Sequence, residues 1–387
     1  MMKRPVIQET FKSYGGGDMR KITLIVFFIF ALYVSGSFLY TNSGFGEVFP
    51  VVDAALYSMG GVSVFSGENP YVFTGTAITL NGGISIPSES RSKRVFDSYD
   101  NTVGKVVVAS GTYFLPGNYG LNARFGNDKI LLGFDFHPYI YSNYRYFNQI
   151  RNEFYVVTGE EETKAEFNVS GYNPYVGFRF GYFSAGLGFR VLNGYSYTYD
   201  RIDTTTTEVW KRWKGYNFNG GFLFTPSPRF SLGVLFNSGF YLNSSSDTLF
   251  YPPVFSTGIR YAPPNLLPSV VMAEIGFIPW TQATMNGGSA GFNDLLIYRF
   301  GIQHKLTSGL FLRLGFNYSG SPVKESIARG TFTAGLGWEK GKNKLDVSFN
   351  FSNINYKGEE VNLTGDLGTL YFSETETDIL VQIRREL

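Results

Sequence analysis

The sequence LDVSFNF at residues 345–351 shows the pattern that decides the fold. Apolar Leu, Val and Phe residues alternate there with Asp, Ser and Asn. A β-strand presents successive side chains to opposite faces, so this stretch predicts a strand with one apolar and one polar face. The sequence FSLGVLF at residues 230–236 repeats the pattern with small residues between the apolar ones, although Leu235 interrupts it. Many such strands with aromatic residues on the apolar face are typical of a membrane-spanning β-barrel.

The same alternation recurs to the C-terminus and predicts an all-β fold, a transmembrane antiparallel up-and-down barrel of 14 strands. We expect the strands at residues 74–86, 104–125, 130–144, 164–180, 182–199, 208–225, 229–242, 251–262, 269–280, 293–305, 309–318, 329–340, 343–355 and 370–385. Six short turns rich in Gly, Pro and Asn alternate with seven longer polar connections. This arrangement places both ends of the barrel chain on the same side of the membrane.

The predicted strands can be divided into a face toward lipid and a face toward the lumen. In the strand at 130–144 we expect Leu132, Phe134, Phe136 and Ile140 to face lipid, and Asp135, His137, Tyr139 and Tyr141 to face the lumen. Charged residues on the polar register of other strands are Arg124, Arg190, Arg299, Arg313, Glu339 and Asp346. A charge facing lipid near mid-membrane costs about 2–4 kcal/mol, so this confinement supports the barrel. A soluble β-sandwich also alternates, but with fewer Phe and Leu residues on strands of this length.

The composition of the chain agrees with a barrel and excludes other classes. Aromatic residues make up 18% of the 387 residues, and charged residues make up 17%. The net charge of +2 gives no indication of a nucleic-acid partner. The chain has no cysteine, which excludes disulfides and thiolate chemistry.

The N-terminus predicts an export signal. Two basic residues precede an apolar run at residues 22–34, and small Ser and Gly residues follow it. This order is typical of a signal peptide, and the run is shorter than the roughly 20 residues of a membrane helix. We expect residues 1–37 to be leader and signal peptide, with a start at Met19 and cleavage near Ser37. The alternative is an uncleaved N-terminal anchor.

Two groups of motifs are more specific than the alternation. The first group contains SMGGVSVF at 58–65, NP at 69–70 and AITL at 77–80. The second contains YRFG at 298–301, LFLRLGFNY at 310–318, SPV at 321–323 and FTAGLG at 332–337. Together they resemble the FadL family, the outer-membrane channels for long-chain fatty acids and other hydrophobic compounds. The family's strand number agrees with the 14 strands counted here.

The resemblance implies a location in the bacterial outer membrane and transport of hydrophobic small molecules such as fatty acids or aromatic compounds. It implies that residues 38–73 form an N-terminal plug inside a barrel at 74–387; the alternative is a disordered periplasmic tail. Sideways exit of the solute into the membrane is a further expectation from the family. The implied partners are the hydrophobic substrate, outer-membrane lipid and lipopolysaccharide, and the barrel-assembly machinery. PorV-like barrels, a related group, act in protein secretion and surface attachment, and these motifs do not separate the two groups.

Residues that carry chemistry are few. The two histidines are His137 and His304, and Asp135 shares a predicted luminal face with His137. A serine hydrolase would need such a pair beside a nucleophile, whereas a luminal polar pair near a strand end is the interpretation we prefer. The sequence contains no metal-ligand spacing, phosphate-binding loop or nucleophile elbow. We therefore expect no enzyme, no cofactor, and no catalytic, cofactor-binding or metal-binding residue. The ligand-binding residues are left unassigned.

Aromatic residues near the predicted outer strand ends have two interpretations. They form an interfacial girdle or strand extensions above it, or they offer a stacking surface to an apolar ligand. The residues are Tyr139, Tyr141, Tyr144, Tyr146, Tyr195, Tyr197, Tyr199, Trp210, Trp213 and Trp280. We favour the girdle for the tyrosines, and for the tryptophans we expect a girdle with contacts to acidic lipopolysaccharide.

Overall fold

The computed structural model describes residues 44–48, 53–99, 101–151, 156–202, 204–264, 267–307, 309–361 and 367–387, so the expected leader at 1–37 lies outside the described residues. The strands are β1 (Glu47–Val48), β2 (Ala77–Phe96), β3 (Thr102–Thr112), β4 (Leu115–Gly126), β5 (Ile130–Arg151), β6 (Val157–Phe180), β7 (Phe183–Ile202), β8 (Thr205–Ser227), β9 (Phe230–Asn237), β10 (Phe240–Asn243), β11 (Thr248–Tyr251), β12 (Val254–Tyr261), β13 (Ser269–Ile278), β14 (Thr284–Met285), β15 (Gly288–Ser289), β16 (Leu295–Thr307), β17 (Leu310–Gly320), β18 (Ala328–Lys340), β19 (Asn343–Val361) and β20 (Leu367–Glu386). The helical elements are α3 (Ala54–Tyr57) and η1 (Trp280–Gln282). Neither of these described helices is long and apolar enough to cross a membrane.

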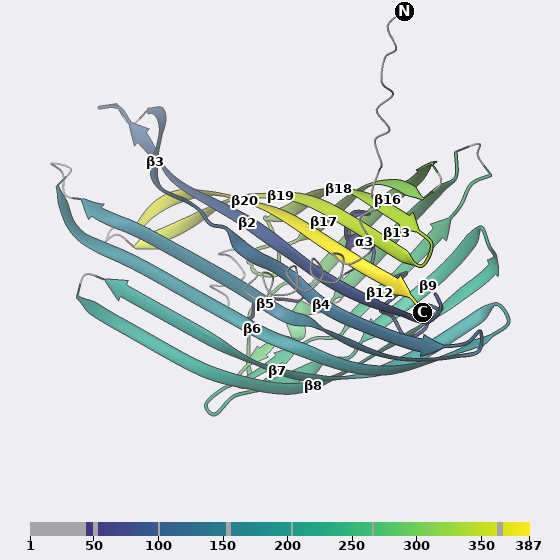
Figure 1. Cartoon of the computed structure of the whole chain (residues 1–387). Coiled ribbons are helices and arrows are strands. Elements are labelled where there is room, and N and C mark those ends of the chain that lie inside the picture. Colours follow the sequence, from purple (N-terminus) through teal and green to yellow (C-terminus); the bar gives the residue numbers. More distant parts are fainter. Residues whose placement is uncertain are drawn as a thin grey trace, which may run out of the picture. The chain divides into compact units, whose positions relative to one another are not determined.

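The described strands form a closed antiparallel barrel with 14 spanning strands, which confirms the predicted fold. Neighbours in the chain pair with one another, and β20 pairs with β2 from Glu386 opposite Ala77 to Leu370 opposite Lys93 (Figure 1). Three spanning strands are interrupted, because β3 continues into β4, β9 into β10 and β11 into β12. The short strands β14 and β15 belong to a hairpin in a connection between spanning strands.

Short turns join the strands at one end of the barrel. The β6–β7 turn contains Gly181 at φ 61°, and the β18–β19 turn contains Gly341 at φ 58°, a conformation that glycine adopts without steric cost. The backbone N–H of Leu387 donates to the carbonyl of Thr76 over 3.1 Å, directly before β2 begins. Both ends of the barrel chain therefore lie together, as the alternation of short and long connections predicts.

Residues 345–351 of β19 show which face of a strand is exposed on the outside and which is buried in the lumen. Val347, Phe349 and Phe351 are exposed on the outside, whereas Asp346 and Ser348 are fully buried. An outer surface of exposed Phe, Leu and Val around a polar interior is the surface that a lipid bilayer requires.

A charge placed on this outer face is expected to destabilise the barrel. Leu336 is 53% exposed on β18 and is paired with Val347 of β19. Leu336→Arg should lower the free energy of unfolding in lipid bilayers by about 2–4 kcal/mol, because the guanidinium must be taken into hydrocarbon. Glu339→Arg, at an exposed position near the end of the same strand, is the control and should change the free energy of unfolding by less than about 0.5 kcal/mol. Equal effects of the two substitutions in urea titrations would contradict a lipid-facing position for Leu336.

A bulge in β5 corrects one predicted face. Pro138 and Ile140 pair with consecutive residues of β6, so Tyr139 is an extra residue in the ladder. Such a bulge reverses which side chains point inward beyond it. Ile140 is consequently buried in the lumen, and its predicted lipid contact is wrong. Tyr144, farther along the strand, is also only 7% exposed.

The charged residues predicted to face the lumen lie inside the barrel, except for Glu339 near the end of its strand. The buried ones are Arg124, Arg190, Arg313 and Asp346, and the side chain of Arg299 is 12% exposed. Arg313 Nη1 of β17 lies 2.8 Å from Asp346 Oδ1 of β19, so these two charges are paired along the inner face of the wall, over Gly337 of β18. Glu339 lies on the same face but is exposed close to the turn after β18.

Residues 53–73, which we call the luminal segment, lie inside the barrel. The segment begins with α3, whose N-cap Asp53 accepts hydrogen bonds from the backbone N–H groups of the first turn. It contacts strands from different sides of the wall: Ala54 N donates to Gln382 of β20 over 2.8 Å, and Ser184 of β7 donates to the Tyr71 carbonyl over 2.7 Å. Most of its side chains are buried, so it fills much of the lumen at this level.

Candidate ligand-binding site in the lumen

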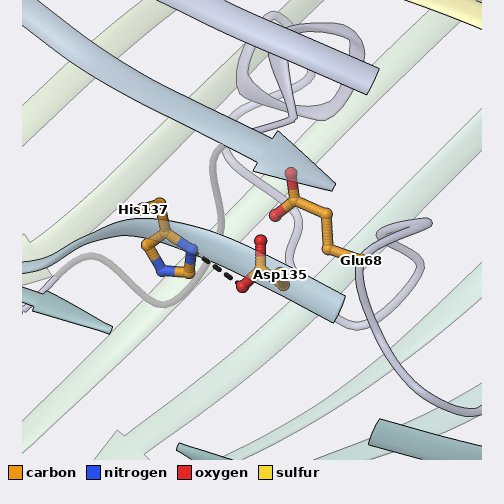
Figure 2. A group of neighbouring side chains, drawn as sticks. All are labelled: Glu68, Asp135 and His137. Atoms are coloured by element: carbon orange, nitrogen blue, oxygen red, sulfur yellow. Dashed lines mark ion pairs between the residues drawn. The ribbon is translucent and has the colours of Figure 1, made fainter. Parts of the chain in front are cut away.

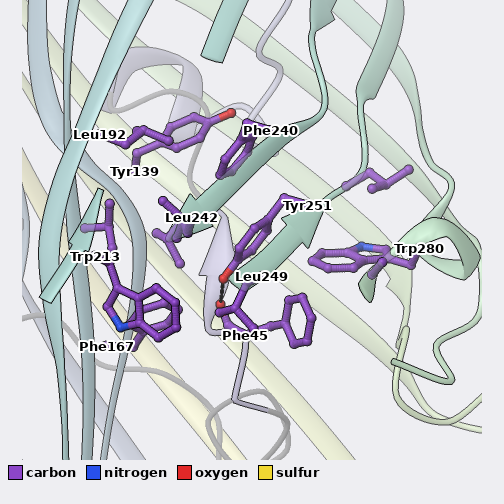
Figure 3. Packing of buried hydrophobic residues seen from close by; sticks show 14 of the residues in the cluster. Phe45, Tyr139, Phe167, Leu192, Trp213, Phe240, Leu242, Leu249, Tyr251 and Trp280 are labelled. Atoms are coloured by element: carbon purple, nitrogen blue, oxygen red, sulfur yellow. Dashed lines mark hydrogen bonds between the residues drawn. The ribbon is translucent and has the colours of Figure 1, made fainter. Parts of the chain in front are cut away.

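Apolar side chains from many strands form one cluster inside the barrel, which we call the aromatic cluster (Figure 3). Its buried members are Phe45, Tyr139, Ile140, Phe167, Val169, Leu192, Trp213, Phe240, Leu242, Leu249, Tyr251, Ile278, Trp280, Ala283, Leu295 and Ile297. They come from β5 to β8, β10, β11, β13, β16 and η1, together with Phe45 before β1 and Ala283 directly after η1. A pocket lined by aromatic and aliphatic side chains is typical of sites for apolar small molecules.

The ring of Phe45 lies between three other aromatic rings at this cluster. Its ring centroid lies 5.3 Å from Tyr251, 6.1 Å from Trp280 and 5.1 Å from Phe292, each in an edge-on arrangement. Such edge-on geometry is favourable for aromatic pairs. The Tyr251 hydroxyl donates to the Phe45 carbonyl, and Phe45 is only 1% exposed. The aromatic cluster therefore encloses one further aromatic ring, that of Phe45, which comes from the N-terminal part of the chain.

The other side of the lumen is polar. A cavity of about 130 Å³ lies beside the luminal segment and is lined by Glu47, Arg329, Glu376, Asp378, Asn350 and others. Arg329 Nη1 is 2.9 Å from Glu47 Oε1, and its Nη2 pairs with Glu376. Burial raises the pKa of Glu47, and the nearby Glu376 carboxylate adds to the rise while Arg329 opposes it. Charged and amide groups line part of this cavity, whereas apolar side chains make up the aromatic cluster.

Glu274 of β13 holds the middle of the luminal segment against the wall. Its carboxylate accepts hydrogen bonds from the Ser63 backbone N–H at 2.6 Å, the Ser63 hydroxyl at 2.8 Å and the Val64 N–H at 2.9 Å. Arg299 of β16 pairs with the same carboxylate. Burial of Tyr71, which donates to the Val64 carbonyl, raises its pKa, so this hydroxyl stays a donor over the ordinary pH range.

Wall glycines allow the backbone of the luminal segment to approach closely. A Cβ atom at Gly315 would lie 2.1 Å from the Gly60 nitrogen, and one at Gly301 would lie 2.5 Å from the Met59 carbonyl oxygen. No side chain fits at these distances, so both positions require glycine for packing rather than for a turn. Both glycines belong to the motifs at 298–301 and 310–318 that carry the family resemblance.

The barrel wall is paired over only a short length between β4 and β5. The ladder joins residues 121–126 to residues 131–136. Beyond that point β5 continues to Arg151 in pairing with β6, whereas on its other edge the described pairings are those of Ile140 and Tyr141 with β1. We call this interruption the β4–β5 seam. The N-terminal residues that carry Phe45 also cover part of the seam.

The aromatic residues singled out in the sequence divide between the two faces. Tyr195 and Tyr197 lie on the outer face against Trp210, each with ring centroids 5.0 Å from it, as a girdle requires. Tyr139 is buried in the lumen, the face predicted for it from the alternation, with the Arg190 guanidinium 4.1 Å from its ring centroid, so the girdle interpretation is wrong for this residue. Tyr141, which lies on the register opposite to Ile140 beyond the bulge and pairs with Glu47 of β1, is also only 2% exposed.

The predicted outer position is also wrong for two of the three tryptophans. Trp213 is 4% exposed and Trp280 is 6% exposed, and both belong to the aromatic cluster. Trp213 lies on the same face of β8 as the luminal Asn217, four residues later. The alternation of the sequence was therefore sufficient to predict its luminal position. Trp280 lies in the short helix η1 after β13, where no periodicity indicates its direction.

His137 and Asp135 meet as the shared register predicts, with Nδ1 of His137 2.9 Å from Oδ2 of Asp135. Both are buried in the lumen, and Glu68 of the luminal segment joins them (Figure 2). No motif or spacing in the sequence indicates that Glu68 lies beside this pair. His304 lies apart from them near the end of β16, where its Nδ1 is 2.8 Å from the Ser269 hydroxyl.

Comparisons with known proteins identify the fold. Neither a family model nor a curated protein matches the chain. Among solved structures, a FadL homologue from Pseudomonas aeruginosa superposes with a TM-score of 0.63 at 13% identity, covering 88% of this chain and 99% of that one. The P. putida toluene transporter TodX gives 0.60 at 13% identity, with 88% and 99% covered, and the Ralstonia pickettii toluene transporter TbuX gives 0.57 at 13%, with 86% and 98% covered. The chain therefore has the 14-stranded barrel fold of the FadL homologue and the two toluene transporters.

Proposed function

We propose that this chain is a channel of the bacterial outer membrane that takes up hydrophobic small molecules, such as long-chain fatty acids or aromatic compounds. The observation that carries the proposal is the enclosure of Phe45 by Tyr251, Trp280 and Phe292 within an apolar cluster in the lumen. An aromatic or alkyl ligand that replaces the Phe45 ring would find the same contacts. The fold shared with toluene transporters supports this substrate class.

The route through the barrel follows from the same geometry. A ligand that displaces Phe45 also disturbs the pairing of β1 with β5, because Glu47 and Val48 come two and three residues later. That displacement would uncover the β4–β5 seam and allow the ligand to leave sideways into the membrane. The luminal segment would block the straight path along the barrel axis for every solute. Apolar solutes would leave sideways through the β4–β5 seam, whereas water-soluble solutes would have no path.

Assembly and surroundings complete the proposal. Export through a signal peptide within residues 1–37 and insertion by the barrel-assembly machinery would bring the chain to the outer membrane. On the outer face, Arg212 and Lys214 are exposed on the strand that carries Trp210, and they would contact lipopolysaccharide phosphates.

Binding of a homologous series of apolar ligands tests the function. We expect the folded protein to bind alkylbenzenes and fatty acids, with affinity rising about fourfold per methylene, since each buried CH₂ contributes about 0.8 kcal/mol. Quenching of tryptophan fluorescence measures the binding, because Trp213 and Trp280 lie in the cluster. Glucose is the control and should not bind.

Mass spectrometry of material co-purified from the native membrane provides the second measurement. A stoichiometric hydrophobic molecule is expected. A stoichiometric protein partner, combined with affinities that do not depend on alkyl length, would contradict transport and favour a role in protein secretion or attachment.

A further inference from the structure

Three side chains with metal-binding atoms converge where the luminal segment meets the wall (Figure 2). Glu68 belongs to the luminal segment, and Asp135 and His137 project from β5. They are 7%, 3% and 1% exposed, and one donor atom from each lies within 4.8 Å of the other two. The His137 ring lies 6.2 Å from that of Tyr139 in the aromatic cluster, but apolar contacts do not account for the two buried carboxylates.

Two carboxylates held together in the interior need compensating positive charge. The guanidinium of Arg124 packs against Gly67, beside Glu68, and donates to Thr74. A cation bound between Glu68 and Asp135 would place further positive charge beside both carboxylates.

An unsatisfied amide at the same level gives a second indication of a bound cation. Asn122 of β4 is the register partner of Asp135 and is fully buried. Its Nδ2 donates to the Tyr175 hydroxyl of β6 over 3.2 Å, and the Tyr175 ring lies over Gly133 of β5, two residues before Asp135. Its Oδ1 has no hydrogen-bond partner among the described atoms. A buried carbonyl oxygen without a donor is costly, and a cation or a water bound to that cation would satisfy it.

The donor set indicates which cations fit. One imidazole nitrogen and two carboxylates suit borderline divalent cations such as Zn²⁺ and Mn²⁺, whereas Ca²⁺ prefers oxygen ligands alone. With metal–ligand bonds of about 2.1 Å, neighbouring ligands lie about 3 Å apart in octahedral coordination and about 3.4 Å apart in tetrahedral coordination. The His137 to Asp135 separation of 2.9 Å corresponds to such a pair of neighbours.

We propose that Glu68, Asp135 and His137 bind one divalent cation, Zn²⁺ or Mn²⁺, which holds the luminal segment to β5. The site lies directly below the β4–β5 seam, because the β4–β5 ladder ends at Phe136. The cation thus stabilises the lumen-filling conformation at the point where the wall is least paired. The sequence gives little sign of it, since Glu68 and the β5 pair lie far apart along the chain.

Metal content of the full-length protein tests the proposal. Folded protein is treated with a chelator, equilibrated with Zn²⁺ or Mn²⁺ alone, freed of excess ion and analysed by mass spectrometry. About one cation per chain is expected. His137→Ala should weaken binding by about 100-fold or more, because even outer ligands of metal sites contribute up to about that factor. His304→Ala removes the other histidine of the chain and is the matched control, which should bind like the wild type.

A second variant and a second measurement keep the test decisive. Glu68→Gln changes the luminal segment and leaves the barrel wall intact, so it serves if His137→Ala fails to fold. Hydrogen exchange of residues 63–72 should slow when Zn²⁺ is added to the wild type and should not respond in Glu68→Gln. Absence of a retained cation in the wild type, or equal retention by His137→Ala and His304→Ala, would overturn the proposal.

Discussion

A chain that lacks residues 38–68 is expected to fold into the closed barrel and to leak small solutes. The wall closes through β2 and β20, whose ladder runs over the length of β2 and needs nothing from the luminal segment. Once the segment is removed, polar groups such as Arg313 and Asp346 line an open lumen that water can fill. Planar-bilayer recordings should show conductance steps that the full-length protein lacks. Unchanged conductance of the deleted form, with an intact barrel by circular dichroism, would rule out a plug.

Glu274→Ala is the point variant that accompanies this deletion. It removes the acceptor for two backbone N–H groups and leaves Arg299 without this partner. Breaking a buried ion pair in this way costs about 3–5 kcal/mol, so the luminal segment should detach intermittently. We expect brief openings rather than the steady conductance of the deleted chain. Glu339→Ala, which changes an exposed carboxylate near a turn, is the control and should stay closed.

Trp280→Ala is expected to cause the largest loss of ligand binding among single substitutions. The indole contacts the rings of Phe45, Tyr251 and Phe292 in the aromatic cluster. Truncating a buried aromatic residue at the centre of a binding site typically costs 2–4 kcal/mol, so affinity for an alkylbenzene should fall by roughly 30- to 1,000-fold.

Trp210→Ala is the matched control for this loss, since Trp210 is 60% exposed on the outer face. Its affinity for the same ligand should stay within about threefold of the wild type, as expected for a residue outside the site. Isothermal titration with both folded variants measures the difference. Equal affinities of the two variants would place the ligand outside the aromatic cluster.

Much of the fold could be predicted because alternation is a local property. Residues 345–351 show both faces of their strand without reference to any other part of the chain, and the structure exposes Phe349 and buries Asp346 as expected. The prediction failed at Ile140, where the bulge at Tyr139 reverses the faces. Bulges depend on how two strands pair, and a single strand's pattern does not contain that information.

Less of the candidate site than of the barrel could be predicted from the sequence. Trp213 could have been assigned to the lumen, because it shares its register with Asn217. Trp280 and Phe45 could not, since both lie outside regular spanning strands and only the folded lumen brings them together. The same holds for Glu68, which meets His137 across the boundary between the luminal segment and the wall.

The sequence by itself determined the number of spanning strands, their antiparallel order and the polarity of most faces, because a period of two and the turn residues act over short distances. Tertiary structure alone decided what fills the lumen, where the wall is interrupted and which side chains form the two candidate sites. Those features depend on contacts between residues distant in the chain, such as Phe45 with Trp280 and Glu68 with Asp135. Such contacts arise only after the barrel has closed around the luminal segment.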